Sequence, residues 1–562
     1  MSLRTHPAWP WIVAAWAGVA QAWALAWPWG VAQADWSQAL SGTGGWLWPV
    51  AGQPWPLLQL GAMVTLVGLL RQAPGPGRAA GLGWVFATAW LAGTFWWLFV
   101  SMHTYGGLAA PLAVAAVLAL AAALAAYTAL ISMLFRRFTL YGYGFLATFL
   151  NSLLFAGLWA LAELARGVWF TGFPWGSVGY AHVNTLAWAA PWIGVYGMGM
   201  LVAAGAAWVA CARHRVRAWL AVVGVLALGP VWTAWQPDFT EPHGDLPLVL
   251  LQGNIAQDEK FLPGSGVPQA MAWYAQRLGG EPGVPPGALV VAPETALPLL
   301  PQQMGPEFWE PLLQRLASQS HAVLLGLPLG SHEDGYANGA WGITPVQAAA
   351  ALGRLAQGTS SRSLDEGPQR FYRYEKHHLV PFGEFVPPLF RWFVDLMAIP
   401  LGDFNRGTLG QATLDWGGQR IATNICYEDL FGEELAQSFS SEVAAPTVLV
   451  NLSNLGWFGN TVALDQHLHI SRLRALELGR PMVRSTNTGA TVVINHRAEV
   501  THAQPRMVAG ALLASVQGRT GLTPFARWAQ RWGLWPVWLL ALALAGGAAW
   551  AGRRQGPVAG LT

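Results

Sequence analysis

Three side chains suited to covalent catalysis stand at or near the ends of short apolar runs. Cys426 lies in IATNICYEDLF (421–431), directly after what reads as a buried strand, Glu294 closes ALVVAPE, and Lys376 stands in RYEKHH. A thiol is a weak nucleophile until it loses its proton, which a carboxylate can take and later return. An ammonium can stabilise the oxyanion of a tetrahedral intermediate. These residue types predict catalysis by a cysteine nucleophile, provided that the fold brings them together.

The scarcity of lysine suggests that Lys376 has a specific role. Of the 31 Lys and Arg residues only Lys260 and Lys376 are lysines. Arginine therefore serves at nearly every position where a cation is used. A lysine that remains suggests a position where a compact ammonium differs from a planar guanidinium.

The composition indicates a membrane protein. Apolar residues make up 54% of the 562 residues, charged residues only 10%, and the mean hydropathy is +0.35. Average soluble domains carry about 25% charged residues. Long apolar segments fill residues 1–236, residues 237–530 read as a water-exposed domain, and residues 531–562 hold a last apolar run. Each segment is near the ~20 residues that cross a bilayer. The eight predicted spans are 8–29, 53–71, 80–102, 107–135, 141–166, 183–211, 216–235 and 531–551.

Arginine placement predicts the orientation of these spans. The links after the second, fourth and sixth spans carry arginines, whereas the links after the first and third carry no Lys or Arg. The positive-inside rule then places both termini in the cytoplasm and residues 237–530 on the outer side. An alternative for the first span is a signal peptide ending at Ala32-Gln33-Ala34, but its apolar region is longer than the usual 7–15 residues.

This orientation separates the two cysteines of the chain. Cys211 falls at the cytoplasmic end of the sixth span and Cys426 in the outer domain, so they cannot form a disulfide within one chain. Disulfides form readily in an oxidising compartment, so an unpaired thiol there suggests a functional role for Cys426. The alternative is a structural role, because a buried free cysteine is often only a small apolar side chain.

The outer domain alternates strand-like and helix-like segments. Such alternation predicts α/β layers around a buried sheet, with functional groups where strands end. Glu294, Cys426 and Asn454 occupy such positions. The predicted strand regions are 245–255, 288–298, 321–330, 420–431, 446–454 and 489–496, and helical patterns cover 307–320 and 464–480.

Three segments carry a family resemblance. PETALP around Glu294, EKHHLVPFGEFVP around Lys376 and NICYEDLF around Cys426 resemble the catalytic segments of the nitrilase superfamily. They are most similar to its membrane-embedded branch, the apolipoprotein N-acyltransferases. GFPWGSVGY, LQGNIAQDEKF, WFGN, LRALELGRPMVRSTNTG and GLTPFARWA extend the resemblance over nearly the whole chain. It implies a four-layer αββα sandwich domain on a multi-pass α-helical membrane domain in the bacterial inner membrane, with the catalytic domain on the periplasmic side.

The resemblance also implies roles for these residues. Glu294 is expected to be the general base, Lys376 the oxyanion-stabilising residue and Cys426 the nucleophile. The residues implied to support the site or bind substrate are Glu384, Tyr427, Glu428, Asn454, Trp457 and Phe458. In the implied ping-pong reaction the cysteine takes an acyl chain from a phospholipid such as phosphatidylethanolamine. The amine of a diacylglyceryl-cysteine at an apolipoprotein N-terminus then accepts it. No cofactor, metal or nucleic acid is implied.

Some segments depart from the family pattern or have open interpretations. Leu455 and Gly456 replace the usual Asp and Ala before WFG, and the turn in INHRAEV (494–500) lacks the usual glycine. The apolar stretch 387–404 is expected to form a lid or membrane-dipping arm, with Trp309 or Trp273 as partners; an ordinary helix is the alternative.

Other functions and sites agree less well with the sequence than catalysis by these three residues. A membrane-anchored amidase would use the same three residues with water as acceptor, and a non-enzymatic scaffold would not need them. WGSVG lacks the first glycine of a G-x-S-x-G elbow, which excludes a serine hydrolase of that kind. His377 and His378 lack further ligands at zinc-site spacing and are expected to fix the loop beside Lys376. Asn487 is expected to be a turn residue in the wall of the site.

Overall fold

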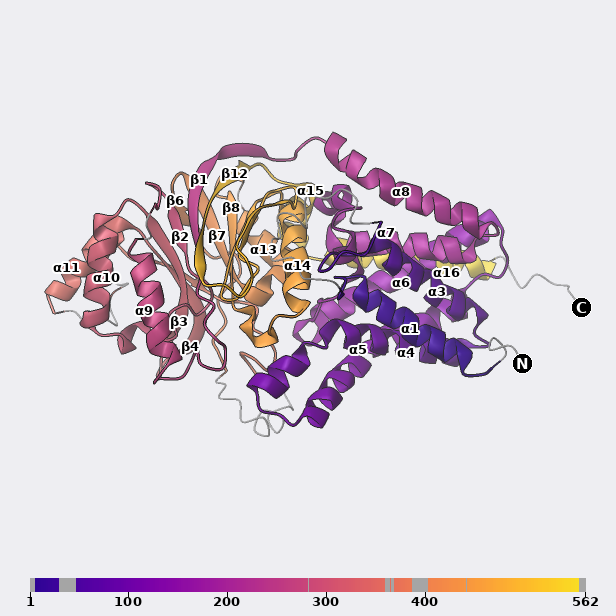
Figure 1. The fold of residues 1–562 in the computed structure, drawn as a ribbon. Coiled ribbons are helices and arrows are strands. Elements are labelled where there is room, and N and C mark those ends of the chain that lie inside the picture. Colours follow the sequence, from indigo (N-terminus) through magenta and orange to yellow (C-terminus); the bar gives the residue numbers. More distant parts are fainter. Residues whose placement is uncertain are drawn as a thin grey trace, which may run out of the picture.

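The computed structural model describes residues 6–29, 47–280, 283–358, 364, 368–386, 403–440 and 442–554. One half of the molecule is helical, and the other contains two β-sheets with flanking helices (Figure 1). The long helices are α1 (Trp9–Trp23), α3 (Pro56–Gln72), α4 (Pro76–Phe95), α5 (Ala110–Phe138), α6 (Phe145–Val168), α7 (Ala190–Cys211), α8 (Arg215–Trp235) and α16 (Trp535–Arg554).

Each of these helices overlaps one predicted span. Within the described residues, five helical segments are long and apolar enough to cross a membrane: 110–138, 145–171, 187–211, 215–235 and 535–554. A helical membrane domain with several apolar helices is therefore confirmed, whereas the number of eight spans stays a prediction. The Ala32-Gln33-Ala34 alternative lies outside the described residues.

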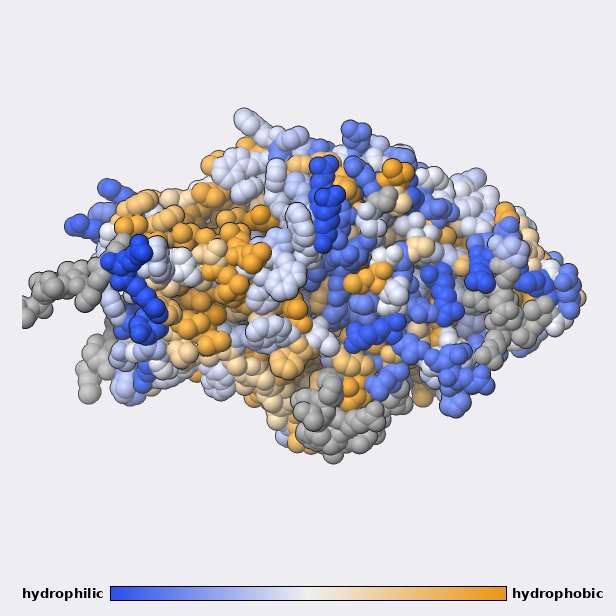
Figure 2. Space-filling view, turned by 180° about the vertical axis from the view of Figure 1, so that it is seen from behind, coloured by the Kyte–Doolittle hydropathy of each residue, from blue (hydrophilic) through white to orange (hydrophobic). Residues whose placement is uncertain are grey.

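The surface of the helical half is apolar, as lipid contact requires. Figure 2 shows orange side chains gathered over this half and blue ones over the other. Exposed large apolar side chains on α5 and α16 include Leu118, Leu130, Leu539 and Leu542. In water such a continuous patch would be unfavourable, but it matches a hydrocarbon environment.

The second half contains two six-stranded sheets. The first has the order β12-β1-β2-β3-β4-β5 and the second β11-β10-β9-β8-β7-β6. Parallel pairing joins β1–β2–β3 and β7–β8–β9, so the carboxyl ends of these strands meet at common edges. The strands are β1 (Glu241–Gln252), β2 (Leu289–Val291), β3 (Ala322–Ser331), β4 (Gly335–Ile343), β5 (Tyr372–Glu375), β6 (Leu414–Trp416), β7 (Gln419–Ile425), β8 (Val448–Ser453), β9 (Met482–Thr486), β10 (Val492–Ile494), β11 (Val500–Ala503) and β12 (Gly510–Thr520).

Three apolar clusters stack these elements into four layers. One cluster packs α9 (Gly266–Leu278), α10 (Pro306–Ser318) and α11 (Pro345–Ala356) on the first sheet. A second lies between the sheets. A third packs the second sheet on α14 (Ala463–Leu478) and α15 (Pro524–Trp532). The predicted αββα sandwich is confirmed, and every predicted strand region contains a strand.

Helix α14 lies between the second sheet and the membrane helices (Figure 1), and all 16 of its residues are buried. Its Glu477 accepts a hydrogen bond from the backbone N–H of Val195 at 2.7 Å, directly after the left-handed Gly194 (φ 64°) in α7. The same carboxylate pairs with Arg474 at 3.0 Å. A buried polar network therefore joins the two halves.

The turn that lacks its usual glycine is strained. Ala498 has a φ of 65°, in the left-handed region that disfavours residues with a Cβ atom. Its carbonyl accepts a hydrogen bond from Arg472 Nε at 2.7 Å, which helps to hold the turn.

Close packing of the last helix gives a first prediction. A Cβ atom on Gly157 of α6 would lie 2.6 Å from Ala541 O and 2.7 Å from Ala545 N of α16. Gly157→Ala should therefore push α16 away and destabilise the protein by about 1–3 kcal/mol. Gly546→Ala is the matched control, since nothing lies within 4 Å of its added methyl. Thermal unfolding in detergent should show a lower midpoint for the first variant only. Equal midpoints would contradict the close contact.

Candidate active site

The structure brings Glu294, Lys376 and Cys426 together, with Glu384 beside them. Glu294 follows β2, Lys376 follows β5 directly and Cys426 follows β7 directly. Lys376 Nζ lies 3.5 Å from Glu294 Oε1 and 2.9 Å from Glu384 Oε2. The thiol of Cys426 lies near enough for the charges of Glu294 and Lys376 to act on it. A carboxylate, an ammonium and a thiol thus share one buried site.

Asn338 of β4 joins the two carboxylates and was not predicted from the sequence. Its Nδ2 donates to Glu294 Oε1 at 2.7 Å and to Glu384 Oε1 at 2.6 Å. Glu294 Oε2 also accepts from the backbone N–H of Asn454 at 2.8 Å. These donors aim the Glu294 carboxylate and hold it beside Glu384.

Lys376 stays positively charged in this setting. Its side chain is 1% exposed. Burial alone would lower the pKa of Lys376, but the charges of Glu384 and Glu294 outweigh it and raise this pKa above its ordinary value. A permanent buried ammonium suits the stabilisation of an oxyanion.

Cys426 sits on a strained turn with a protonated thiol. Its φ is 52°, a left-handed conformation that costs free energy for a residue with a side chain. Burial and the negative charge of Glu294 raise the pKa of the Cys426 thiol, and Lys376 opposes them only in part. The thiol is therefore neutral at rest and needs a base to become a nucleophile.

Glu428 ties the turn at Cys426 to the loop that follows Lys376. Its carboxylate accepts hydrogen bonds from the backbone N–H of Ile425 (2.6 Å), His377 (2.6 Å) and His378 (3.2 Å), and from the Tyr374 hydroxyl (2.8 Å). Burial raises the pKa of Glu428 to about 7, although the N–H of Ile425 and the charge of Lys376 oppose this. The carboxylate positions two loops at once.

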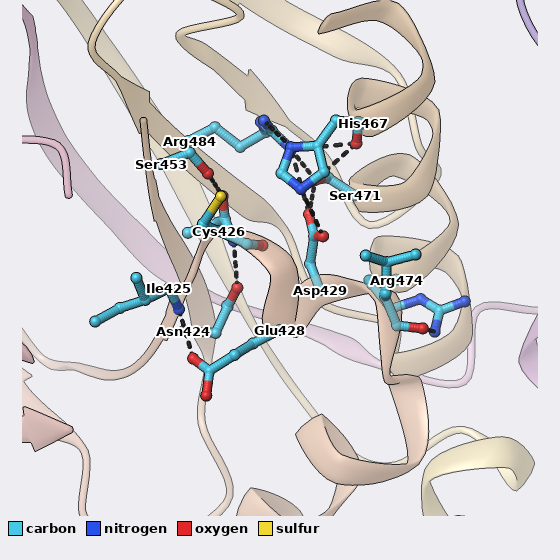
Figure 3. Close-up of polar contacts among 12 residues, drawn as sticks. Asn424, Ile425, Cys426, Glu428, Asp429, Ser453, His467, Ser471, Arg474 and Arg484 are labelled. Carbon is cyan, nitrogen blue, oxygen red and sulfur yellow. Dashed lines mark hydrogen bonds and ion pairs between the residues drawn. The ribbon is translucent and has the colours of Figure 1, made fainter. Parts of the chain in front are cut away.

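Asp429 anchors the other end of the same turn (Figure 3). Asp429 Oδ2 lies 3.2 Å from Arg484 Nη1, and Oδ1 lies 3.0 Å from His467 Nε2, a contact too poorly aligned for a hydrogen bond. Arg484 Nη2 lies 2.7 Å from His467 Nδ1. A guanidinium only donates, so Nδ1 accepts and the neutral ring carries its proton on Nε2, facing Asp429. Burial alone would raise the pKa of Asp429, but His467 and Arg484 outweigh it and lower this pKa.

Tyr427 connects the turn at Cys426 to the membrane domain. Its hydroxyl donates to Gly172 O at 3.0 Å, and its ring packs on Phe173. Nearby, Trp175 stacks on His467 with ring centroids 5.4 Å apart. The loop after α6 thus contacts both Tyr427, which follows Cys426, and His467 of α14.

The remaining residues predicted to support the site are Asn454, Trp457 and Phe458. Asn454 Nδ2 donates to Gln257 Oε1 at 2.8 Å, and Asn487 Nδ2 donates to Asn454 Oδ1 at 3.2 Å. Trp457, 39% exposed, faces Tyr105 of the helical half. Phe458 packs against Trp97 and Trp175, with centroids 4.3 Å and 6.5 Å away. Leu455, which replaces the usual Asp, is fully buried.

Both histidines beside Lys376 hold their loop. His377 Nδ1 lies 2.7 Å from Gly407 O. His378 Nδ1 lies 2.9 Å from Glu434 Oε1, and its ring stacks on Phe431. Among the described residues, no group of three or more His, Cys, Asp or Glu side chains is placed to hold a metal ion.

The lid hypothesis stays a prediction. Residues 387–402 lie outside the described residues. Trp309 is fully buried on α10, and its Nε1 donates to Pro301 O at 3.0 Å. Trp273 lies on α9 in the same outer layer, under the guanidinium of Arg277.

Comparisons with known proteins agree with this architecture. Residues 288–525 match the carbon–nitrogen hydrolase family, and residues 41–208 match the family described as the apolipoprotein N-acyltransferase N-terminal domain. Fold and site thus define a membrane protein with a nitrilase-like domain. The chain is 49% identical over 553 residues to an apolipoprotein N-acyltransferase of Verminephrobacter eiseniae, covering 93% of both proteins. It is 40% identical over 476 residues to that of Ralstonia nicotianae, covering 84% of this chain and 86% of the relative. The chain belongs to the apolipoprotein N-acyltransferase family.

One similar solved structure aligns with about half of this chain. A CN-hydrolase superfamily protein from Xanthomonas campestris aligns with 53% of this chain and 97% of its own length, at 16% identity and a TM-score of 0.33.

The contacts of Glu428 yield a second prediction. In Glu428→Gln one oxygen still accepts, but the amide NH₂ faces the donors of either the Lys376 loop or the Cys426 turn, and these lose their partner at a cost of about 1–3 kcal/mol. The link between the two segments is then broken on one side, and modification of Cys426 by substrate should slow by about 10- to 100-fold. Tyr374→Phe removes one donor and leaves the backbone contacts, so it should cost much less. Equal losses in the two variants, both folded by circular dichroism, would contradict the positioning role.

Proposed function

We propose that this chain transfers an acyl chain from a phospholipid, through a thioester on Cys426, to the N-terminal amine of a diacylglyceryl-cysteine on apolipoproteins. This would be the last step of lipoprotein maturation. The observation that carries the proposal is the convergence of Glu294, Lys376 and Cys426 on a turn that also contacts the membrane helices through Tyr427. A lipid substrate needs such a site, because its acyl chain stays in the bilayer while its ester bond is attacked.

The first half-reaction follows from the state of the thiol. Cys426 Sγ attacks the carbonyl carbon of a phospholipid ester, such as one in phosphatidylethanolamine, while Glu294 takes the thiol proton. The oxyanion that forms faces the Lys376 ammonium. The ester C–O bond then breaks, Glu294 returns the proton to the departing alkoxide, and a lysophospholipid leaves.

The second half-reaction reverses these roles. The α-amine of the apolipoprotein attacks the thioester carbonyl and gives a proton to Glu294. The C–S bond breaks, the proton passes to Sγ, and an amide has formed. A thioester keeps the acyl group reactive toward an amine after the first product has left, which a ping-pong mechanism requires.

The supporting residues act by position. Glu384 and Asn338 hold Lys376 and Glu294 at their distances, and Glu428 holds the Cys426 turn. We assign Asn454, Trp457 and Phe458 to the wall on the membrane side of the site, where the acyl chain or the lipoprotein would pass.

For the chain as a whole we propose a membrane domain of residues 1–236, a periplasmic catalytic domain of residues 237–530 and a final span with a cytoplasmic tail in residues 531–562. It would lie in the bacterial inner membrane. In support, α1 begins and α16 ends at the end of the helical half that lies away from the sheets (Figure 1). Arginines flank the end of α16 at Arg553 and Arg554.

The third prediction tests the reaction. Purified protein in mixed micelles with alkyne-tagged phosphatidylethanolamine should gain a hydroxylamine-labile label on Cys426, located by mass spectrometry. Cys426→Ala should gain none. Glu294→Gln should slow labelling by about 10²- to 10⁴-fold, and Lys376→Met by about 10²- to 10³-fold.

The label should then move to a synthetic diacylglyceryl lipopeptide with a free α-amine. An N-acetylated copy of the same lipopeptide is the control, since it has no amine to accept the acyl group. Release of the label to water alone, with the amine present, would favour an amidase-like hydrolase. A folded protein that never acquires the label would overturn the proposal.

A further inference from the structure

Both lysines of the chain meet the same glutamate. Lys376 Nζ lies 3.5 Å from the Glu294 carboxylate, and Lys260 Nζ donates a hydrogen bond to the backbone carbonyl of Glu294 at 3.2 Å. Lys260 is 1% exposed and lies in the loop between β1 and α9. The proposed mechanism uses Lys376 but leaves the second buried ammonium without a role.

Lys260 is costly to bury. No ion pair joins it to a carboxylate within the part of the chain that the structure describes. Burial lowers the pKa of Lys260 to about 8, opposed only in part by the charge of Glu294. The side chain is thus charged at neutral pH in a place that disfavours charge, which calls for a compensating benefit.

The charges around Glu294 supply that benefit. Glu294 and Glu384 accept from the same Asn338 amide and flank the same Lys376 ammonium. Two carboxylates with one ammonium leave an excess negative charge in the site. A second ammonium cancels that excess. The titratable groups that face Glu294 are therefore Lys376 and Glu384 after β5, Cys426 after β7 and Lys260 after β1.

Lys260 also holds the main chain that aims the base. Thr295, directly after Glu294, has a φ of 50°. A Cβ atom on Gly326 of β3 would lie 2.7 Å from Glu294 Cα, so the Glu294 backbone lies tightly against that strand. The bond from Lys260 fixes the carbonyl between these two constraints.

We propose that Lys260 is a positioning residue for catalysis, which fixes the backbone of Glu294 and balances the negative charge that its carboxylate shares with Glu384, so that Glu294 can accept the Cys426 proton. This inference rests on the proposed function. Lys260 acts through Glu294 and does not touch the reacting atoms.

The fourth prediction uses the pH dependence of thioester formation. Lys260→Met keeps the apolar stem and removes the charge, so the excess negative charge of the site is no longer balanced. The acid limb of the rate profile should move to higher pH by about one unit. Lys260→Arg keeps a charge at every pH tested, so its acid limb should stay where the unsubstituted protein has it, even if the rate falls. Glu259→Gln, a change of charge at an exposed neighbour, should leave the limb unmoved.

A second readout needs no lipid. Alkylation of Cys426 by iodoacetamide, followed by mass spectrometry against Cys211, should show the same shift of its acid limb in Lys260→Met. A slower rate with an unmoved limb would mean that Lys260 only packs, and would overturn the inference. A shift in Lys260→Arg equal to that in Lys260→Met would overturn it as well.

The design separates this inference from the function on which it rests. If the unsubstituted protein forms no thioester with phospholipid, the proposed function fails. If it forms one and the limb of Lys260→Met does not move, the function stands and the role of Lys260 is refuted. Should Lys260→Met not fold, Lys260→Gln, which retains a hydrogen-bond donor to the Glu294 carbonyl, gives the same test.

Discussion

The left-handed backbone of Cys426 is the constraint on which the site depends. A residue with a Cβ atom keeps such a conformation only where its surroundings enforce it. Glu428 holds the residue before Cys426, and Asn451 Nδ2 donates to the Cys426 carbonyl at 3.1 Å. Asp429 anchors the end of the turn on Arg484. These contacts present Sγ beyond the end of the sheet, where Glu294 and Lys376 reach it.

Part of that enforcement comes from the membrane domain. Tyr427 rests on Gly172, and the loop after α6 is in turn held by Arg166, which donates to the carbonyls of Phe173 (2.6 Å) and Trp175 (2.7 Å). On the other side of α14, Glu477 binds the backbone of α7. The membrane domain therefore forms one wall of the turn that carries Cys426.

Strand ends and apolar periodicity allowed most of the frame to be predicted. The sequence placed Glu294, Cys426 and Asn454 where strands end, and the structure has them there. Asn338 was missed because Asn-Gly usually indicates a hairpin turn, whereas Asn338 and Gly339 lie inside β4, paired with β3 and β5. The Asp429, His467 and Arg484 network was missed for another reason. Charged positions of a helix usually face solvent, yet α14 is enclosed by the sheet and the membrane helices, so its charged side chains pair with other buried groups.

The protonated state of Cys426 also bears on its survival as an unpaired thiol. Oxidation and disulfide exchange require the thiolate. Burial and Glu294 raise the pKa of Cys426, and the second cysteine, Cys211, is buried in α7. An oxidant would therefore meet a neutral thiol. In the proposed mechanism Glu294 removes the proton only as a carbonyl carbon accepts the sulfur, so the electrostatics that make the resting thiol a poor nucleophile also protect it. Reactivity then depends on the substrate carbonyl and on the Lys376 ammonium that stabilises its oxyanion.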